Sequence, residues 1–323
     1  MMPDLNRWKP AASLKNQRCR ARLYSAIRKF FSDQKVLEVE TPILSEYTVT
    51  DVNIESFQTT YCDYKEKHQY YLQTSPEYAM KRLLAGGSGP IYQICKAFRN
   101  GEIGAQHNPE FTLLEWYRPD FSYQDLMDEV DRLLQFTLQT RKSIRKTYCE
   151  LFLEHLSIDP IEISLKELQI LSRQFLLENS EDYRDRDTLL QFLFTRTIEP
   201  KIGLNQPLFV YEFPVSQAAL AKIHPKNSNV ALRFEVYIEG IECANGFEEL
   251  TDAQMQRNRF EQDILKRREK GLSEIAIDCR FLSALKSGMP SCSGVALGLD
   301  RLLMVKTKKR QIKDVIAFPV DIA

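Results

Sequence analysis

The sequence predicts an α+β fold in which an antiparallel β-sheet is flanked by helices. Two observations carry this prediction. Segments with the alternation of β-strands occur in pairs joined by short loops, and segments with apolar residues at helical spacing lie before, between and after these pairs. Strands that follow one another through short loops pair antiparallel. With 323 residues, 43% of them hydrophobic, the chain is long enough to bury one large core.

Helices are expected where apolar residues recur every three or four positions. Ser75 is the expected N-cap of the second helix. Because several of the helices fall in the middle of the chain, we expect a single domain over residues 1–323 with a helical insertion at about 120–200. The expected helices cover residues 16–33, 76–85, 122–139, 166–178, 187–196 and 252–270.

The first strand pair lies within residues 92–119 and has the chemistry of a nucleotide site. Arg99 ends its first strand. On the second strand Phe111, Glu115 and Tyr117 share a face, because residues two apart in a strand point the same way. An arginine fork suits a phosphate and an aromatic ring suits a flat base, so the pair suggests a nucleotide beside a small cationic substrate. The alternative is an ordinary core strand with an aromatic face.

The second strand pair lies within residues 233–250 and brings two carboxylates together. A two-residue turn at Glu239-Gly240 fixes its register. Glu235 and Glu242 then become diagonal neighbours on one face, and a divalent cation such as Mg²⁺ is the natural counter-ion for such a pair. A solvated carboxylate pair is the alternative. The expected cross-strand partners are Ile238 with Ile241, Tyr237 with Glu242 and Glu235 with Ala244.

The end of this strand decides which later carboxylate shares the face of Glu242. Strict alternation selects Glu248. Asn245-Gly246 lies between, however, and a glycine inside a strand often marks a bulge, whose extra residue would turn Glu249 inward instead. Parity alone leaves both registers open.

A third segment, residues 291–304, adds a possible phosphate site at a helix start. A small, apolar run ends at Gly298, and a helix begins near Leu299 and carries Arg301 in its first turn. Glycine lets a backbone approach a ligand closely, and a helix N-terminus favours anions. Most glycines in such positions belong to ordinary strand-to-helix turns, so this segment gains weight only beside the other two.

Together these segments resemble the motifs of class II aminoacyl-tRNA synthetases. Motif 1 is matched by Lys35–Ser45 with its proline at Pro42, motif 2 by Phe98–Phe111 and motif 3 by Gly294–Leu302. The lysyl branch is indicated by TSPEYAMKRLL at 74–84, RFEVYIEGIECANGFEEL at 233–250 and DVIAFP at 314–319. The resemblance runs from about residue 14 to the C-terminus and is weakest at roughly 140–200.

Within that branch the chain is similar to a family of lysyl-tRNA synthetase paralogues, the elongation factor P lysyltransferases. The stretches that carry this likeness are EVETPILSEYTVTD, TSPEYAMKRLLAGGSGPIYQ, EDYRDRDTLLQFLF and PSCSGVALGLDRL. Motif 1 begins about 35 residues from Met1, which leaves no room for the five-stranded anticodon-binding barrel of the synthetases. The resemblance implies an ATP- and Mg²⁺-dependent homodimer that adenylates lysine or (R)-β-lysine and transfers it to a lysine side chain of elongation factor P.

The resemblance also implies roles for individual residues. Arg99 would bind the α-phosphate and Arg301 the γ-phosphate, which makes these two the catalytic residues. A carboxylate attacks the α-phosphorus without a general base, so catalysis would rest on positioning and charge. The other ATP-binding residues would be Asn100, Gly101, Glu102, His107, Asn108, Phe111 (stacked on adenine), Glu242, Cys243 and Gly298, with Glu235 and Glu242 holding Mg²⁺. The amino acid would be bound by Ser75, Pro76, Glu77 (at one amino group), Tyr117 and Glu249 (at the distal ammonium) and Ala296.

Two positions depart from the family pattern. Gly101 stands where a glutamate is usual, so either Glu102 takes that role after a loop shift or the contact is lost. Ala296 stands where lysyl-tRNA synthetases usually have glycine, and its extra methyl hints at a β-amino acid; such discrimination is worth roughly 1–3 kcal/mol.

Two other functions stay open: a truncated lysyl-tRNA synthetase that charges tRNA, and a non-catalytic regulatory subunit. Lys+Arg and Asp+Glu both number 44, and this balance argues mildly against a large tRNA footprint. The seven cysteines are scattered without metal-site spacing, so a reduced cytoplasm is the expected compartment. Neither a signal peptide nor a membrane span is expected.

Overall fold

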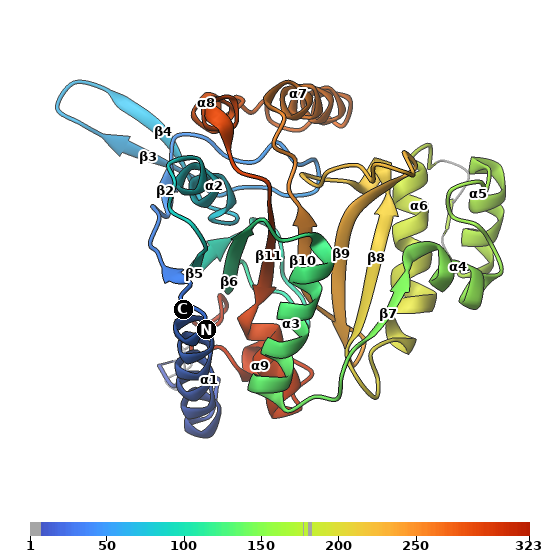
Figure 1. Cartoon of the computed structure of the whole chain (residues 1–323), viewed down its shortest axis with the longest axis horizontal. Coiled ribbons are helices and arrows are strands. Elements are labelled where there is room, and N and C mark those ends of the chain that lie inside the picture. The colour runs from blue at the N-terminus through green and yellow to red at the C-terminus, as the bar shows by residue number, and fades with distance from the viewer. Residues whose placement is uncertain (1–7, 177, 180–182) are drawn as a thin grey trace, which may run out of the picture. The chain divides into compact units, whose positions relative to one another are not determined.

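The structure, a computed structural model, describes residues 8–176, 178–179 and 183–323, and it divides into two compact units. The first unit combines the described residues up to Phe121 with Leu250–Ala323, and the second is Ser122–Glu249. Both have a sheet with mostly antiparallel pairing and helices beside it, as the predicted α+β class requires (Figure 1). One domain with a helical insertion stays a prediction.

The sheet of the first unit is built from the motif segments. Its strand order is β1 (Leu37–Glu38), β5 (Ile91–Phe98), β6 (Glu110–Pro119) and β11 (Cys292–Gly298). Strand β1 runs parallel to β5, whereas β6 pairs antiparallel with both β5 and β11. The register aligns Gln93 and Ala296 on either side of Glu115, so these three residues form one row across the sheet.

Helices and a small hairpin complete this unit. Helix α2 packs on α8, α8 on α7, and α9 on both α1 and β6. A second sheet, with strand order β2-β4-β3, ends in a hairpin that extends away from the other elements of this unit (Figure 1). The helices are α1 (Leu14–Asp33), α2 (Glu77–Ala85), α7 (Ala253–Glu269), α8 (Cys279–Gly288) and α9 (Leu299–Thr307). The strands of the small sheet are β2 (Leu44–Ser45), β3 (Gln58–Cys62) and β4 (Lys67–Leu72).

The start of α2 corrects one expectation. The N-cap is Pro76, not Ser75. Proline lacks an N–H and its fixed φ suits a helix entry, so the helix begins directly after it at Glu77. The Oγ of Ser75 still accepts a hydrogen bond from the Glu77 N–H at 3.1 Å, which holds the turn in front of the helix.

The second unit contains four paired strands in the order β10-β9-β8-β7. Strands β10, β9 and β8 pair antiparallel, and β7 runs parallel to β8. Helix α3 packs on β9 and β10, whereas α4 packs on β7 and β8. The strands are β7 (Ile144–Thr147), β8 (Leu208–Pro214), β9 (Val230–Ile238) and β10 (Ile241–Glu248). The helices are α3 (Tyr123–Leu138), α4 (Tyr148–Leu156), α5 (Leu165–Gln174) and α6 (Arg186–Leu193).

The β9–β10 hairpin confirms two of the three expected cross-strand partners. Ile238 pairs with Ile241 and Tyr237 with Glu242, but Glu235 pairs with Asn245 instead of Ala244. A bulge between Glu242 and Ala244 adds the extra residue at Cys243.

The bulge therefore exists, although it does not sit at Asn245-Gly246. Cys243 is buried, and the ladder absorbs the extra residue there, three positions before the glycine. Phe247 consequently pairs with Arg233 on the face that carries Glu242, and continued alternation puts Glu249, not Glu248, on that face.

Among the described residues, no helix combines the length and apolar character that crossing a membrane requires.

Candidate active site

Arg99 and Phe111 lie against each other at the open end of β5 and β6. The Arg99 N–H donates to the Pro109 carbonyl at 2.9 Å, which fixes the point where the chain leaves the strand. The guanidinium carbon of Arg99 is 5.1 Å from the centroid of the Phe111 ring, a cation–π distance. The Arg99 side chain remains 29% exposed. The structure thus brings together the residues predicted for the α-phosphate and for adenine.

The loop after Arg99 places a carboxylate one residue later than the family pattern. Gly101 has φ of +79°, a left-handed conformation that glycine adopts without strain. The Glu102 carboxylate lies 3.7 Å from the Arg99 guanidinium. Asn100 is held by a backbone bond of 2.8 Å to the Glu55 carbonyl. Whether Glu102 takes the expected role after a loop shift, or that contact is lost, stays open.

Arg301 contacts the loop that connects β5 and β6. Gly298 is the N-cap of α9, and the Nη2 atom of Arg301 lies 2.7 Å from Nε2 of His107. The Arg301 Nε also donates to the Gln106 carbonyl at 3.4 Å. A Cβ at Gly298 would meet only the Arg301 side chain at 3.7 to 3.9 Å, an ordinary contact. Packing within the chain therefore does not require glycine there, and close approach of a ligand stays its predicted role.

Asn108 has a structural task in the same loop. Its amide nitrogen donates to the Glu110 carbonyl at 2.6 Å, and its amide oxygen accepts from the Val320 N–H at 3.1 Å. Through these two bonds, one at the nitrogen and one at the oxygen, the buried Asn108 amide anchors the loop. The predicted contact between Asn108 and ATP stays a prediction.

A buried carboxylate, Glu115, joins two of the predicted substrate residues. Ser75 Oγ donates to one of its oxygens at 2.7 Å, and the Tyr117 hydroxyl donates to the other at 2.6 Å. Burial, and next the charge of Glu77, raise the pKa of Glu115 to about 7. Glu115 was expected on the face of Tyr117, but without a role of its own. That shared face, with a carboxylate inside an apolar strand, was the available signal.

Ala296 stands beside this carboxylate. It is the direct cross-strand partner of Glu115, and Gly294 is the partner of Tyr117. Side chains of directly opposed residues share a face with Cβ atoms about 5 Å apart. The extra methyl of Ala296 is thus placed where it narrows the space next to Glu115.

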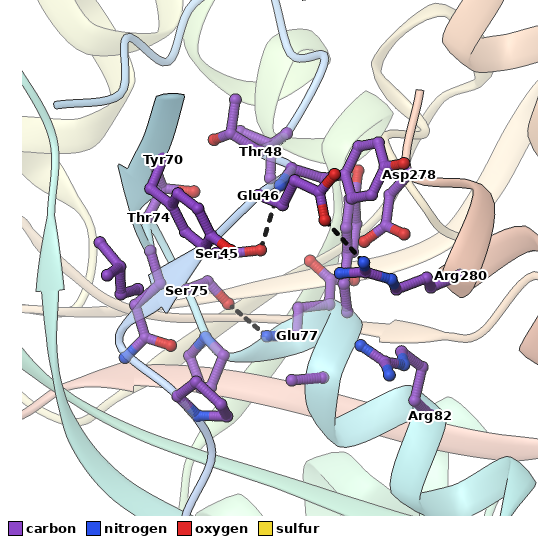
Figure 2. Close-up of a pocket in the computed structure, with 18 residues that line it drawn as sticks. Ser45, Glu46, Thr48, Tyr70, Thr74, Ser75, Glu77, Arg82, Asp278 and Arg280 are labelled. Atoms are coloured by element: carbon purple, nitrogen blue, oxygen red, sulfur yellow. Dashed lines mark hydrogen bonds and ion pairs between the residues drawn. The ribbon is translucent and has the colours of Figure 1, made fainter. Parts of the chain in front are cut away.

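A small cavity of ≈ 170 Å³ adjoins the predicted substrate turn (Figure 2). Ser75, Pro76 and Glu77 line it together with charged side chains from other segments. Figure 2 shows the Ser75–Glu77 bond and the ion pair between Glu46 and Arg280, which measures 2.6 Å. The further charged residues on its wall are Arg82 and Asp278.

The remaining predicted residues belong to the second unit. Both oxygens of the buried Glu235 accept hydrogen bonds, one from Arg233, with which it also forms an ion pair, and one from the Tyr237 hydroxyl at 2.6 Å. Arg233 therefore supplies the counter-ion that was expected to be Mg²⁺. Nor do the described residues include any group of three or more histidine, cysteine, aspartate or glutamate side chains suited to a metal. Glu235 is neutralised by Arg233 in this arrangement, and ligation of Mg²⁺ by Glu235 and Glu242 stays a prediction.

Two other predicted site residues of this unit are also buried. Cys243 lies at the bulge, with its Sγ 3.5 Å from the Ile241 carbonyl oxygen, which suits a packing role. Glu249 is 3% exposed and forms an isolated β-bridge with Ala221. Nucleotide binding at Cys243 and ammonium binding at Glu249 stay predictions.

Comparison with known proteins identifies the family. Residues 6–322 match the family described as tRNA synthetases class II (D, K and N). A protein of Photobacterium profundum is 51% identical over 319 residues, which span 98% of this chain and 99% of that protein. A protein of Erwinia tasmaniensis is 52% identical over 325 residues, with 99% of both chains covered. Both relatives are named elongation factor P--(R)-beta-lysine ligase. The resemblance inferred from the motifs is thereby confirmed, and the chain belongs to the class II tRNA synthetase family.

Proposed function

We propose that this protein uses ATP to activate (R)-β-lysine or lysine as an aminoacyl-adenylate and then transfers the acyl group to a lysine side chain of elongation factor P. The observation that carries the proposal is the likeness, at 51% identity over 98% of the chain, to a relative named as that ligase. The contacts of Arg99 with Phe111 and of Arg301 with His107 support it, because they gather the groups that an ATP-using member of this family needs.

In the activation step, the substrate carboxylate attacks the α-phosphorus and pyrophosphate leaves. Arg99 and Arg301 stabilise the negative charge that develops on the phosphoryl oxygens. A carboxylate is already ionised at neutral pH, so these residues need only position the phosphate and neutralise its charge. Arg99 is partly oriented before binding by its contact with the Phe111 ring.

The amino groups of the substrate would be bound at the opposite, buried end of the site. Glu115 is held by Ser75 and Tyr117, and Glu77 is tied to the same serine through its N–H. Carboxylates and a phenol in this arrangement suit an ammonium group. We propose Glu115 and Tyr117 for one ammonium, with Glu249 as a further ligand, and Glu77 for the other.

Three finer points belong to the same proposal. ATP is the nucleotide, and Mg²⁺, if held by Glu235 and Glu242, would neutralise phosphate charge. The protein acts as a homodimer through the segment around Pro42. The protein acts in the cytoplasm, where an acceptor that serves translation is found.

The test is acyl transfer from labelled lysine and (R)-β-lysine, with ATP and Mg²⁺, to elongation factor P and tRNA offered in parallel. Label on the protein, stronger with (R)-β-lysine, is the expected result. Label on tRNA alone would replace the proposal with a truncated synthetase. No adenylate and no transfer would indicate a regulatory subunit.

A further inference from the structure

Lys81 is a fully buried lysine one helical turn after a predicted substrate residue. Its side chain is 1% exposed, and its Nζ lies 2.6 Å from Oε1 of Glu77. The same Nζ lies 5.7 Å from the centroid of the Phe281 ring on α8. Lysine is almost never buried to this degree unless it is paired, because desolvating its charge is costly. The ion pair with Glu77 therefore explains why a lysine can be buried at this position.

The carboxylates linked to Lys81 outnumber the cations that contact them. Ser75 links Glu77 and Glu115, because its Oγ accepts from the Glu77 N–H at 3.1 Å and donates to Glu115 at 2.7 Å. Of the hydrogen bonds and ion pairs that Glu77 and Glu115 make in the described part of the chain, only the one from Lys81 brings a positive charge. Two carboxylates and one ammonium leave room for one more cation, and under the proposed function an ammonium group of the substrate would supply it.

We infer that Lys81 is a positioning residue for amino-acid specificity, which pairs with the Glu77 carboxylate and holds it oriented toward a substrate ammonium. The inference rests on the proposed function and names a residue that acts through Glu77 and not on the reacting atoms. Without the Lys81 ammonium, the Glu77 carboxylate loses the ion-pair partner that fixes its direction. The site then has one well-oriented carboxylate fewer for the ammonium groups of the substrate.

Lys81 also contacts α8. Phe281, beside the lysine, stacks on Tyr78 with ring centroids 4.5 Å apart. Because α2 packs on α8, the Glu77 carboxylate is fixed by a helix pair and not by a loop. Sites built on packed helices hold a ligand more precisely than sites on loops.

The test measures amino-acid-dependent exchange between ATP and pyrophosphate in three variants. Lys81→Met keeps the length of the side chain but loses the charge, and should raise the KM for the amino acid roughly tenfold or more while leaving the KM for ATP unchanged. Lys81→Arg keeps the charge and should stay within a few-fold of the wild type. The matched control is Lys29→Met, since Lys29 makes the same four-residue helical pair, 2.9 Å from Asp33, but is 65% exposed.

Glu77→Gln provides a second route if Lys81→Met does not fold. Once Glu77 is neutral, adding Lys81→Met should have little further effect on the KM for the amino acid. A large further rise, or an equal rise in both KM values for the single variant, would overturn the inference. If the wild type shows no exchange, the proposed function fails instead. Calorimetric binding of the amino acid then still decides, since the inference requires its loss with Lys81→Met and its retention with Lys29→Met.

Discussion

The predicted nucleotide end of the first unit, at Arg99 and Phe111, and its predicted amino-acid end, at Glu115 and Tyr117, are built in opposite ways. At the nucleotide end, Arg99 rests on the face of Phe111 and remains 29% exposed. At the amino-acid end, Glu115 and Tyr117 are each 2% exposed, and each oxygen of Glu115 has a donor. One end presents partly solvated cations, whereas the other presents a buried carboxylate.

This difference suits what each end is proposed to bind. A phosphate chain brings several negative charges, and partly hydrated arginines can bind and release it without a large desolvation cost. A single ammonium group brings only one charge to bind, so the carboxylates that select it must be desolvated and positioned before it arrives. Substitutions at the nucleotide end should therefore lower the rate, and substitutions at the amino-acid end should change which substrate is accepted.

The largest effect is expected at Arg301. Arg301→Ala removes the predicted γ-phosphate ligand, and we expect pyrophosphate exchange to fall by at least about a hundredfold. Lys309→Ala, at an exposed lysine just beyond α9, is the control and should leave exchange unchanged. A loss of less than about tenfold in Arg301→Ala would mean that the nucleotide end does not depend on this cation.

A large but different effect is expected at Glu115. Burial raises its pKa to about 7, above the usual value for glutamate. The ionised form, which binds an ammonium, prevails above that pH and is lost as the pH falls through it, so the KM for the amino acid should rise on acidification from pH 8 to 6. Glu115→Gln should raise this KM roughly ten- to a hundredfold at pH 8, the worth of a hydrogen bond to a charged group, and flatten its pH dependence. An unchanged pH profile in the variant would assign the titration to another group.

A smaller effect concerns the choice of substrate. Ala296→Gly removes the methyl beside Glu115 and should shift the ratio of kcat/KM toward lysine and away from (R)-β-lysine by roughly tenfold. The same ratio measured with Ala284→Gly, a substitution on α8, controls for general loosening. An unaltered ratio would remove Ala296 from the specificity argument.

The smallest effect completes a matched pair. Glu102→Gln makes the same chemical change as Glu115→Gln, but at a carboxylate that is 29% exposed and 3.7 Å from Arg99. Exposed ion pairs contribute little, so we expect less than about a fivefold rise in the KM for ATP and no change in the KM for the amino acid. If the two glutamates gave equal effects, burial would not be what separates the two ends.

The sequence anticipated the local pairings better than the long-range ones. The Glu239-Gly240 turn predicted the pairing of Ile238 with Ile241, because a two-residue loop leaves little freedom. The bulge was expected at a glycine but lies at Cys243. Its place depends on how the ladder and the core share the extra residue, and no local signal in the sequence encodes that balance.

The candidate site shows the same division. Arg99 was expected beside the face that carries Phe111, because the two strands follow each other through one loop and pair antiparallel. The role of Glu115 was missed because its partner Ser75 lies 40 residues earlier in the chain. Likewise Lys81 reads as an ordinary helical lysine until the packing of α2 on α8 shows that it is buried. Burial of a polar group is decided by tertiary contacts, which residue spacing does not report.

The division of the chain into units has a consequence for its synthesis on the ribosome. The second unit is one uninterrupted segment, so all its strands are available once residue 249 has been made. The first unit is split, and β6 finds its neighbour β11 only after Cys292–Gly298 has emerged, when the second unit is already complete. Nascent chains fold in the order in which their parts become complete. The strands that carry Glu115 and Ala296 therefore come together after the second unit has been made, and the site between them forms late in synthesis.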